Sequence, residues 1–513
     1  MTVNTPATAT AYLPLRHRRD DELIEQSEAA AFVEELVAAG LELHSFLIAR
    51  EDAIVFERHW WPARPGLLHT LHSATKSLVG TAVGLAVDEG ALDLDDRVVD
   101  RLASHLSGAE PDGLERVTVR DLLTMRGGNA SGISGATSRR EEGSLVRLFL
   151  AEPIAHEPGS RFVYSSATSH LLSAVVQEST GRTTEQYLAE KLFAPLGIRS
   201  WRWDTDPDGV STGGNGLRLA PEDLARFALA HANGGVWRGE RILPAHWVAD
   251  AGRRHVARAH AGTWDGQRLV GGAAADTEDG YGYQFWVHEG GSYSAQGVFG
   301  QTALIDPVSR VVVVTTGALT ESQHDALLAA LNTALLPLLR EGANGRINAR
   351  TEDRGAGENN RILTTSAPDE ASDSGIRPAG IVDGVFVFDE NPVGLESLTV
   401  RVADDGVEVA FTDARGRHSL WNPYEGWSDG VTSVYGWQLH HSYECDDEPV
   451  LTHGGWIRAD TLELDWRFPE MPFRDRLRVT FDGDAATVDR WTNVNSGATR
   501  LPTLSARRSA HGG

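Results

Sequence analysis

The sequence predicts two domains. The first is an α/β (α+β) domain over residues 1–341, in which an antiparallel sheet holds an inserted helical region, and the second is an all-β barrel or sandwich domain over residues 376–513. Strand-like segments occur at both ends of the first region with helix-like segments between them, and helix signals almost vanish after residue 376. A chain of 513 residues is also too long for one ordinary hydrophobic core.

The first domain begins with a polar, helix-forming run, Asp20–Ala39, followed by two strand-like segments, Glu42–Ala49 and Ala53–Trp60, joined by a turn at Glu51-Asp52. Helical segments follow at Ser73–Glu89, Val119–Met125, Ser166–Ser179, Thr184–Phe193, Pro221–Ala232 and Pro244–His255. Strand character returns at Tyr281–Val287, Gln301–Ile305 and Val311–Thr316, and Glu321–Leu339 is a predicted closing helix. We therefore expect one sheet built from both ends of the domain.

The second domain is separated from the first by residues 342–375, which are rich in Gly, Asn, Asp, Glu, Ser and Thr and predict a flexible linker. Beyond the linker, apolar and polar residues alternate in short runs separated by turns. These runs are Ser397–Val402, Val407–Phe411, Thr461–Phe468 and Arg476–Phe481. The pattern predicts an antiparallel β-barrel or sandwich.

Composition restricts the partners and the compartment. A net charge of −25 argues against nucleic acid and against anionic membranes, since both require a basic face. Cys445 is the sole cysteine, so an intrachain disulfide and a thiolate metal cluster are excluded. The first residues show no apolar core of the signal-peptide kind, and Ala326–Leu339 is too short to span a bilayer. We expect a cytoplasmic protein.

Lysine usage provides the first indication of chemistry. Lys76 and Lys191 are the two lysines of the chain, whereas arginine fills nearly every other cationic position. Arginine cannot be deprotonated in a protein, so a retained lysine can serve as a neutral amine that accepts a proton. Ser73 lies three residues before Lys76, on the same face of the predicted helix. The alternative is that Ser-x-x-Lys arises by chance, which a common residue such as serine permits.

A second polar group occurs at Tyr164-Ser165-Ser166, in extended chain just before a predicted helix. A phenol and a hydroxyl two residues apart can project towards one site. A half-buried tyrosine beside a helix-capping serine is the structural alternative.

Other catalytic classes lack their motifs. The sequence contains no Gly-x-Ser-x-Gly elbow, no His-Glu-x-x-His and no Gly-x-x-x-x-Gly-Lys loop. The nineteen histidines are scattered without ligand spacing. No metal and no cofactor is expected.

Taken together, these residues resemble the serine β-lactamase and penicillin-binding protein superfamily, closest to class C β-lactamases and their esterase-like relatives. The resemblance covers about Phe46 to Leu339 and rests on Leu71-His72-Ser73-Ala74-Thr75-Lys76-Ser77, Val117–Thr124, the Pro-Gly…Tyr-x-Ser run and Gly213–Leu219. It implies that Ser73 is the acylated nucleophile and Lys76 its proton acceptor. It also implies that Tyr164 relays protons to the leaving group and that Ser166 hydrogen-bonds the lysine.

The third motif of this superfamily is a strand beside the nucleophile with Lys-Thr-Gly or His-x-Gly. Here the matching segment is Ala295-Gln296-Gly297, which has no cation, and the second oxyanion N–H implied by the resemblance falls on Val298. The segment is more similar to that of the 6-aminohexanoate-oligomer hydrolases and carboxylesterases of the same superfamily. Tyr281, Tyr283 and Trp286 either line an acyl pocket or pack in the core.

We therefore expect a serine hydrolase that cleaves an ester or amide of a small molecule through an acyl-enzyme on Ser73. One alternative is an amidase of the D-aminopeptidase or DD-peptidase kind. Another is a low-turnover, penicillin-binding-like sensor or scaffold. A homo-oligomer is the alternative to a monomer.

Overall fold

The computed structural model describes residues 15–17, 23–108, 110–265, 268–270, 279–345, 363–366, 374–378, 382–434, 436, 438–444 and 446–509. Two compact units make up the chain. One comprises Thr2–Trp60 and Arg64–Thr364, and the other comprises Trp61–Ala63 and Thr365–Gly513. Of the expected linker, residues 346–362 and 367–373 lie outside the described residues.

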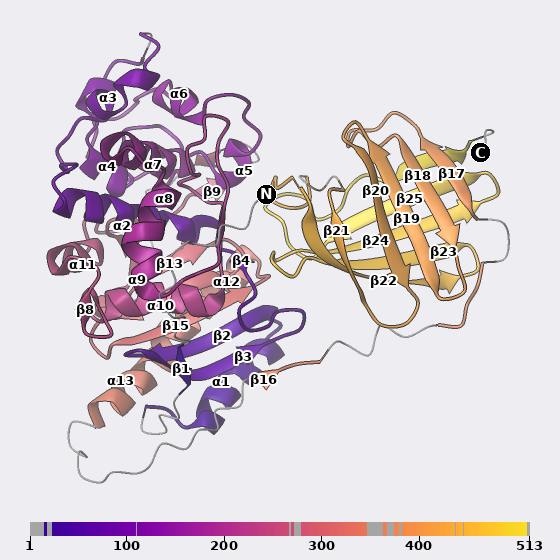
Figure 1. Cartoon of the computed structure of the whole chain (residues 1–513), viewed down its shortest axis with the longest axis horizontal. Coiled ribbons are helices and arrows are strands. Elements are labelled where there is room, and N and C mark those ends of the chain that lie inside the picture. The colour runs from indigo at the N-terminus through magenta and orange to yellow at the C-terminus, as the bar shows by residue number, and fades with distance from the viewer. Residues whose placement is uncertain are drawn as a thin grey trace. The chain divides into compact units, whose positions relative to one another are not determined.

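The first unit is built on a sheet whose strands come from both ends of the unit (Figure 1). Its strand order is β1-β3-β2-β15-β14-β13-β12-β11, and β16 also pairs with β3. The bounds are β1 Arg16–His17, β2 Leu43–Arg50, β3 Ala53–His59, β11 Gly280–Tyr281, β12 Trp286–Val287, β13 Tyr293–Gly297, β14 Gln301–Asp306, β15 Val311–Gly317 and β16 Leu363–Thr364. Strand β2 pairs antiparallel with β15, which joins the two ends as predicted.

Two short edge strands make this sheet mixed rather than purely antiparallel. Strands β1 and β16 both run parallel to β3, and each consists of two residues. Strand β16 lies in the segment predicted as linker, and helix α13 (Leu336–Gly345) also extends into that segment. Two-residue edge pairings carry no alternating pattern that a sequence could reveal.

Helices cover both faces of the sheet because its long strands are apolar on both sides. Leu47, Val312 and Val314 pack in one core with helices α2 (Thr75–Asp88), α7 (Ser166–Thr180) and α10 (Pro221–Ala232). Their sequence neighbours Phe46, Val311 and Val313 point to the other face, against α1 (Gln26–Ala38) and α12 (Glu321–Ala330).

The helical region inserted between β3 and β11 contains the remaining short elements. They are β4 His69–Thr70, α3 Val98–Arg101, α4 Val119–Leu123, α5 Gly135–Ser138, α6 Leu145–Leu150, α8 Thr184–Leu188, α9 Ala194–Leu196, β5 Arg202–Trp203, β6 Leu217–Leu219, β7 Val236–Trp237, β8 Glu240–Arg241, α11 Ala245–Ala251, β9 Thr263–Trp264 and β10 Leu269–Val270. Thr118 caps α4 and Thr183 caps α8, each through a capping box.

The predicted strand Tyr281–Val287 is interrupted. Residues 282–285 leave the sheet between β11 and β12, and Gln284 has φ +64°. A Cβ at Gly282 would lie 2.0 Å from the carbonyl oxygen of Ala251, so this glycine permits a close backbone approach that bends the chain. The sequence predicted strand character over Tyr281–Val287 but not this bend.

The second unit contains one ten-stranded antiparallel sheet with the order β20-β19-β18-β17-β26-β25-β24-β23-β22-β21. The bounds are β17 Gly384–Phe388, β18 Ser397–Val402, β19 Gly406–Asp413, β20 Gly416–Pro423, β21 Ser428–Thr432, β22 Glu448–Arg458, β23 Thr461–Arg467, β24 Arg474–Asp482, β25 Ala485–Thr492 and β26 Leu504–Arg508. Near the ends of this order the sheet curls back on itself, because Thr452 Oγ1 on β22 donates a hydrogen bond of 2.6 Å to the carbonyl of Trp421 on β20. The sheet is therefore a nearly closed barrel, with Trp456 and Trp466 buried inside.

Candidate active site

Ser73 lies in a tight turn immediately before helix α2. It occupies the 3-10 turn η1 (His72–Ala74), where it is partly exposed while its neighbours His72 and Ala74 are buried. His72 has φ +47°, a left-handed conformation that costs a non-glycine residue about 1 kcal/mol or more. The ring of His72 packs edge-on against Phe299, with ring centroids 5.3 Å apart. The serine hydroxyl is thus presented from a constrained turn.

Lys76 lies in the first turn of α2, where its amine meets three oxygen atoms. Its Nζ lies 3.0 Å from Ser73 Oγ, 3.1 Å from Ser166 Oγ and 2.6 Å from the carbonyl oxygen of Gly214. A neutral amine has two N–H donors and one lone pair. Donation to Gly214 and Ser166 leaves the lone pair for the hydroxyl proton of Ser73.

The surroundings of Lys76 favour this neutral form. The residue is 1% exposed, and burial, followed by the positive charge of Arg139, lowers its pKa from 10.5 to about 7. Removing an ammonium from water disfavours its charged state. The amine can therefore act as a proton acceptor near neutral pH.

Two glycines allow α7 to approach the lysine. A Cβ at Gly214 would lie 2.6 Å from Ser166 Cβ, and one at Gly213 would lie 2.1 Å from the carbonyl oxygen of Ser169. Any side chain at either position would push α7 away. The Gly213-Gly214 pair therefore brings the Gly214 carbonyl and the Ser166 hydroxyl to the same amine.

Tyr164 completes this group of side chains. Its phenol is hydrogen-bonded to the Ser73 side chain, and Lys76 Nζ lies 5.0 Å from the centre of its ring. Burial raises the pKa of Tyr164 to about 12, so the hydroxyl keeps its proton at neutral pH. A neutral phenol that touches the nucleophile can pass a proton but does not act as a resident phenolate.

The Tyr164–Ser166 segment is held by a neighbouring loop. The amide of Ser166 donates to the carbonyl of Ile133 at 2.7 Å, and the amide of Ile133 donates to Ser165 Oγ at 3.1 Å. A Cβ at Gly132 would lie 1.8 Å from the carbonyl oxygen of Tyr164. The loop therefore requires a glycine at residue 132.

Of the three aromatic residues considered for an acyl pocket, Trp286 is the one that fits. Tyr281 and Tyr283 are each 1% exposed and belong to the core. Trp286 is partly exposed, and its ring lies 5.5 Å from that of Tyr164 at an interplanar angle of 32°. It provides an apolar wall beside the phenol.

The segment Ala295-Gln296-Gly297 lies on β13, beside the nucleophile turn. A Cβ at Gly297 would lie 2.1 Å from the carbonyl oxygen of Leu71 and 3.2 Å from the amide nitrogen of Ala74, so the strand backbone touches η1 on both sides of Ser73. Ala295 is fully buried and offers no charge.

The turn that follows β13 is fixed by Gln301. Its side-chain amide donates to the carbonyls of Val298 at 3.3 Å, Phe299 at 3.0 Å and Gly317 at 3.0 Å. These bonds hold Val298, the residue implied as the second oxyanion donor, in a rigid backbone turn.

A scan against protein-family models matches residues 29–336, more than half of the chain, to the model described as Beta-lactamase. The chain belongs to the beta-lactamase family. Its curated relatives include the 6-aminohexanoate-dimer hydrolase of Paenarthrobacter ureafaciens, which is 27% identical over 289 residues, or 53% of this chain and 71% of that protein. This chain is accordingly a hydrolase of that family, as the resemblance predicted.

Solved structures to which this chain is similar include a family VIII carboxylesterase and the octameric penicillin-binding protein homologue of Pyrococcus abyssi. The carboxylesterase is 18% identical with a TM-score of 0.47, and the match covers 65% of this chain and 99% of the carboxylesterase chain. The Pyrococcus homologue is 16% identical with a TM-score of 0.44, and the match covers 94% of this chain and 99% of the homologue's chain.

Within this beta-lactamase-family unit, the sequence predicted Ser73, Lys76, Tyr164 and Ser166, and the structure brings all four together. Gly214 was noted as part of a motif without a role, although it supplies the shortest contact to the lysine. Arg139 and the Gly132–Ile133 loop were missed, because no local pattern links a loop to a distant lysine. The double glycine was the one available signal.

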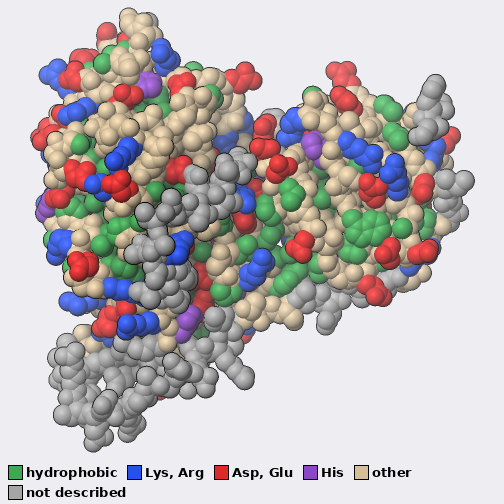
Figure 2. All heavy atoms as spheres, viewed as in Figure 1, with side chains coloured by type: hydrophobic (Ala, Val, Ile, Leu, Met, Phe, Trp, Pro, Cys, Tyr) green, Lys and Arg blue, Asp and Glu red, His purple; other side chains and the backbone are tan. Residues whose placement is uncertain are grey.

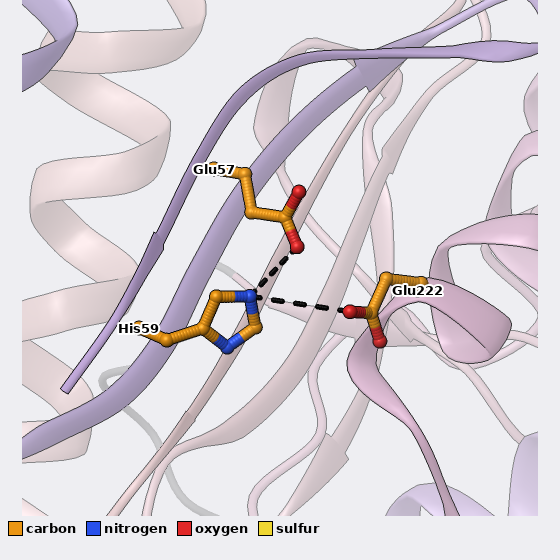
Figure 3. A group of neighbouring side chains, drawn as sticks. All are labelled: Glu57, His59 and Glu222. Carbon is orange, nitrogen blue, oxygen red and sulfur yellow. Dashed lines mark hydrogen bonds and ion pairs between the residues drawn. The ribbon is translucent and has the colours of Figure 1, made fainter. Parts of the chain in front are cut away.

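A separate group, Glu57, His59 and Glu222, has the residue types that bind metal ions (Figure 3). His59 Nε2 lies 2.7 Å from Glu57 Oε1 and 4.0 Å from Glu222 Oε1. Burial, followed by the negative charge of Glu57, raises the pKa of Glu222 to about 8. Glu222 therefore carries a proton at neutral pH. This proton removes the negative charge of Glu222, so the group does not need a metal cation to balance two carboxylates.

The surface carries charges of both signs. In Figure 2 acidic and basic side chains are interspersed over the face that is drawn. Among the described residues no helix is both long and apolar enough to cross a membrane.

Proposed function

We propose that the chain is a serine hydrolase that cleaves an ester or amide bond of a small molecule through a covalent acyl-enzyme on Ser73. The observation that carries the proposal is a lysine with a pKa of about 7 whose Nζ lies 3.0 Å from Ser73 Oγ. A base of this pKa matches proton transfer at neutral pH. The general hydrolase activity of the family supports the same reaction class.

In the acylation step, Ser73 Oγ attacks the substrate carbonyl carbon while its proton passes to Lys76 Nζ. The backbone N–H groups of Ser73 and Val298 stabilise the oxyanion. When the bond to the leaving group breaks, the Tyr164 hydroxyl delivers a proton to the leaving oxygen or nitrogen and is reprotonated from Lys76. Water then attacks the acyl-enzyme by the same proton path in reverse and releases the acid.

The substrate preference follows from β13. Ala295 supplies no cation for a substrate carboxylate, so we propose that esters and simple amides are cleaved better than β-lactams. Trp286 beside Tyr164 favours an apolar acyl group. A cytoplasmic location and a homo-oligomeric state belong to the same proposal.

Intact-mass labelling with a fluorophosphonate tests the nucleophile. We expect one adduct on the wild type and none on Ser73→Ala, whereas Ser104→Ala, at an exposed serine, labels normally. An adduct that persists in Ser73→Ala contradicts the proposal. Steady turnover of short-chain esters separates an enzyme from a sensor, which gives only a stoichiometric burst, and D-amino-acid amides test the amidase alternative.

A further inference from the structure

A chain of hydrogen bonds leads from a carboxylate to Gln296, next to the nucleophile turn. Asp279 Oδ1 lies 2.9 Å from His288 Nδ1, His288 Nε2 lies 2.8 Å from Ser294 Oγ, and Ser294 Oγ accepts a bond of 2.8 Å from Gln296 Nε2. The mechanism proposed above uses none of these four side chains.

The order Ser, His, Asp matches that of a catalytic triad, but burial excludes Ser294 as a second nucleophile. Ser294 is fully buried within β13 and His288 is 5% exposed. A substrate carbonyl cannot reach the Ser294 hydroxyl. Asp279 and Gln296 at the two ends are partly exposed, and Gln296 is the one that adjoins the nucleophile turn.

The donor and acceptor roles along this series of hydrogen bonds follow from the carboxylate at its end. A carboxylate only accepts, so in the neutral imidazole His288 Nδ1–H donates to Asp279 and His288 Nε2 is left as an acceptor. The Ser294 hydroxyl then donates to His288 Nε2, and its oxygen can only accept from Gln296. One of the two Gln296 N–H groups is therefore committed to Ser294, which fixes the orientation of the amide and leaves Oε1 as its acceptor, beside the second N–H.

Gln296 Oε1 accepts no hydrogen bond from the described residues, and Gln296 adjoins the candidate site. Gln296 directly precedes Gly297, whose backbone touches the η1 turn on both sides of Ser73. We propose that Gln296 Oε1 accepts a hydrogen bond from an N–H on the acyl portion of the substrate, and that Asp279, His288 and Ser294 are positioning residues that hold it in that orientation. The inference rests on the proposed function and narrows its substrates to acyl groups that carry an amide or amine N–H.

A matched pair of substrates tests this inference. The p-nitrophenyl esters of N-acetylglycine and N-acetyl-N-methylglycine share a leaving group, and the second carries N–CH₃ where the first carries N–H. We expect the wild type to prefer the first by about tenfold in kcat/KM, the discrimination typical of one hydrogen bond to a group that is otherwise left unpaired. Gln296→Met should bring the ratio close to one.

Two serine variants, one on β13 and one just before it, distinguish positioning of Gln296 from general packing. Ser294→Ala interrupts the series of hydrogen bonds between His288 and Gln296. It should lower the preference for the N–H substrate at least threefold, chiefly by raising KM for that substrate. Ser292→Ala removes a buried hydroxyl that bonds to Asn332 instead and should leave the preference unchanged. An unchanged preference in Gln296→Met, or equal losses in both serine variants, overturns the inference.

Fluorophosphonate labelling of each variant keeps this outcome separate from that of the proposed function. Absence of a fluorophosphonate adduct on the wild type contradicts the assignment of Ser73 as the nucleophile. Normal labelling of the wild type without any preference for the N–H substrate contradicts only the role of Gln296.

Discussion

At the scale of single residues, Lys76 shows why this position needs an amine rather than a guanidinium. The side chain is buried among a carbonyl and two hydroxyls, and burial disfavours its charged form. Each pKa unit of such a shift corresponds to about 1.4 kcal/mol. An arginine would stay charged, and the burial of its unpaired charge would cost free energy without producing a base.

The pH dependence of hydrolysis follows from this residue. Lys76 accepts a proton only when it is neutral, so kcat/KM for a neutral ester should rise with pH through an apparent pKa near 7 and then stay level to pH 9. Lys76→Arg should lower kcat by about 10²–10⁴-fold and abolish the pH dependence. Lys191→Arg, at the other lysine, is the matched control and should behave like the wild type. A flat profile for the wild type would exclude Lys76 as the base.

At the scale of elements, the active site is formed where helices α2 and α7 and the Gly213-Gly214 segment meet. Helix α2 carries the Lys76 amine. Helix α7 brings the Ser166 hydroxyl to it, and the glycine segment brings the Gly214 carbonyl oxygen. The contact depends on the absence of a side chain at residue 214.

Gly214→Ala should therefore move the glycine segment and helix α7 apart. The new Cβ would lie 2.6 Å from Ser166 Cβ, so the segment or α7 must shift, and a shift near 1 Å costs about 10²-fold in kcat. Gly127→Ala is the control, because a Cβ there meets only atoms at 3.5 Å. The rate of fluorophosphonate labelling and kcat measure the effect. Equal rates in the two variants would show that the Gly214 carbonyl does not position the lysine.

The contact between β3 and the start of α10 has a pH dependence of its own. Glu222 has a pKa of about 8 in the folded state against 4.5 ordinarily, so the fold binds its proton more tightly than the unfolded chain does. The free energy of unfolding should therefore fall as pH rises from about 4.5 to about 8 and stay low above that.

Glu222→Gln removes this loss, because glutamine resembles the protonated acid and cannot ionise. We expect thermal unfolding of the variant to match the wild type near pH 5 and to occur several degrees higher at pH 9. Glu240→Gln, at an exposed position on β8, should show no such difference. The same shift at both pH values would mean that Glu222 is not a buried acid.

Local patterns predicted the elements better than the contacts between them. The helix Pro221–Ala232 and the strand Ser397–Val402 match the predicted bounds, since a first-turn proline and strict alternation mark their limits. The Ser-x-x-Lys contact was predictable because the turn that holds Ser73 runs directly into helix α2, which keeps residues three apart on one face. The role of Gly214 and the Asp279–His288–Ser294 chain were not predictable, because each joins segments through tertiary packing that sequence spacing does not encode.

At the scale of the whole molecule, the barrel has a core of its own with a buried ion cluster. Asp475 is fully buried between Arg490, whose Nε lies 2.8 Å away, and His440, whose Nε2 lies 2.8 Å away. Arg490 and then His440 lower the pKa of Asp475 to about 2 against the effect of burial. Asp475 therefore stabilises the fold above pH 3.8, and this contribution is lost as the pH falls towards 2.

Asp475→Asn should destabilise the barrel by about 3–5 kcal/mol, because Arg490 is left buried without its counter-charge. Denaturant unfolding monitored by tryptophan fluorescence reports on the loss, since Trp466 lies in the same core, 5.9 Å from the Arg490 guanidinium. Asp429→Asn on the exposed face of β21 is the control. Equal unfolding midpoints for the two variants would rule out a stabilising role for the cluster.

The pairing of β2 with β15 has a consequence for how the chain is made. Strand β2 ends at Arg50 and its partner begins at Val311, so a ribosome must add about 260 residues before the sheet can close. At cellular translation speeds this takes roughly 15 to 50 s. Throughout that interval the nascent β2–β3 hairpin exposes an apolar edge, and it is the stage at which chaperone binding would matter most.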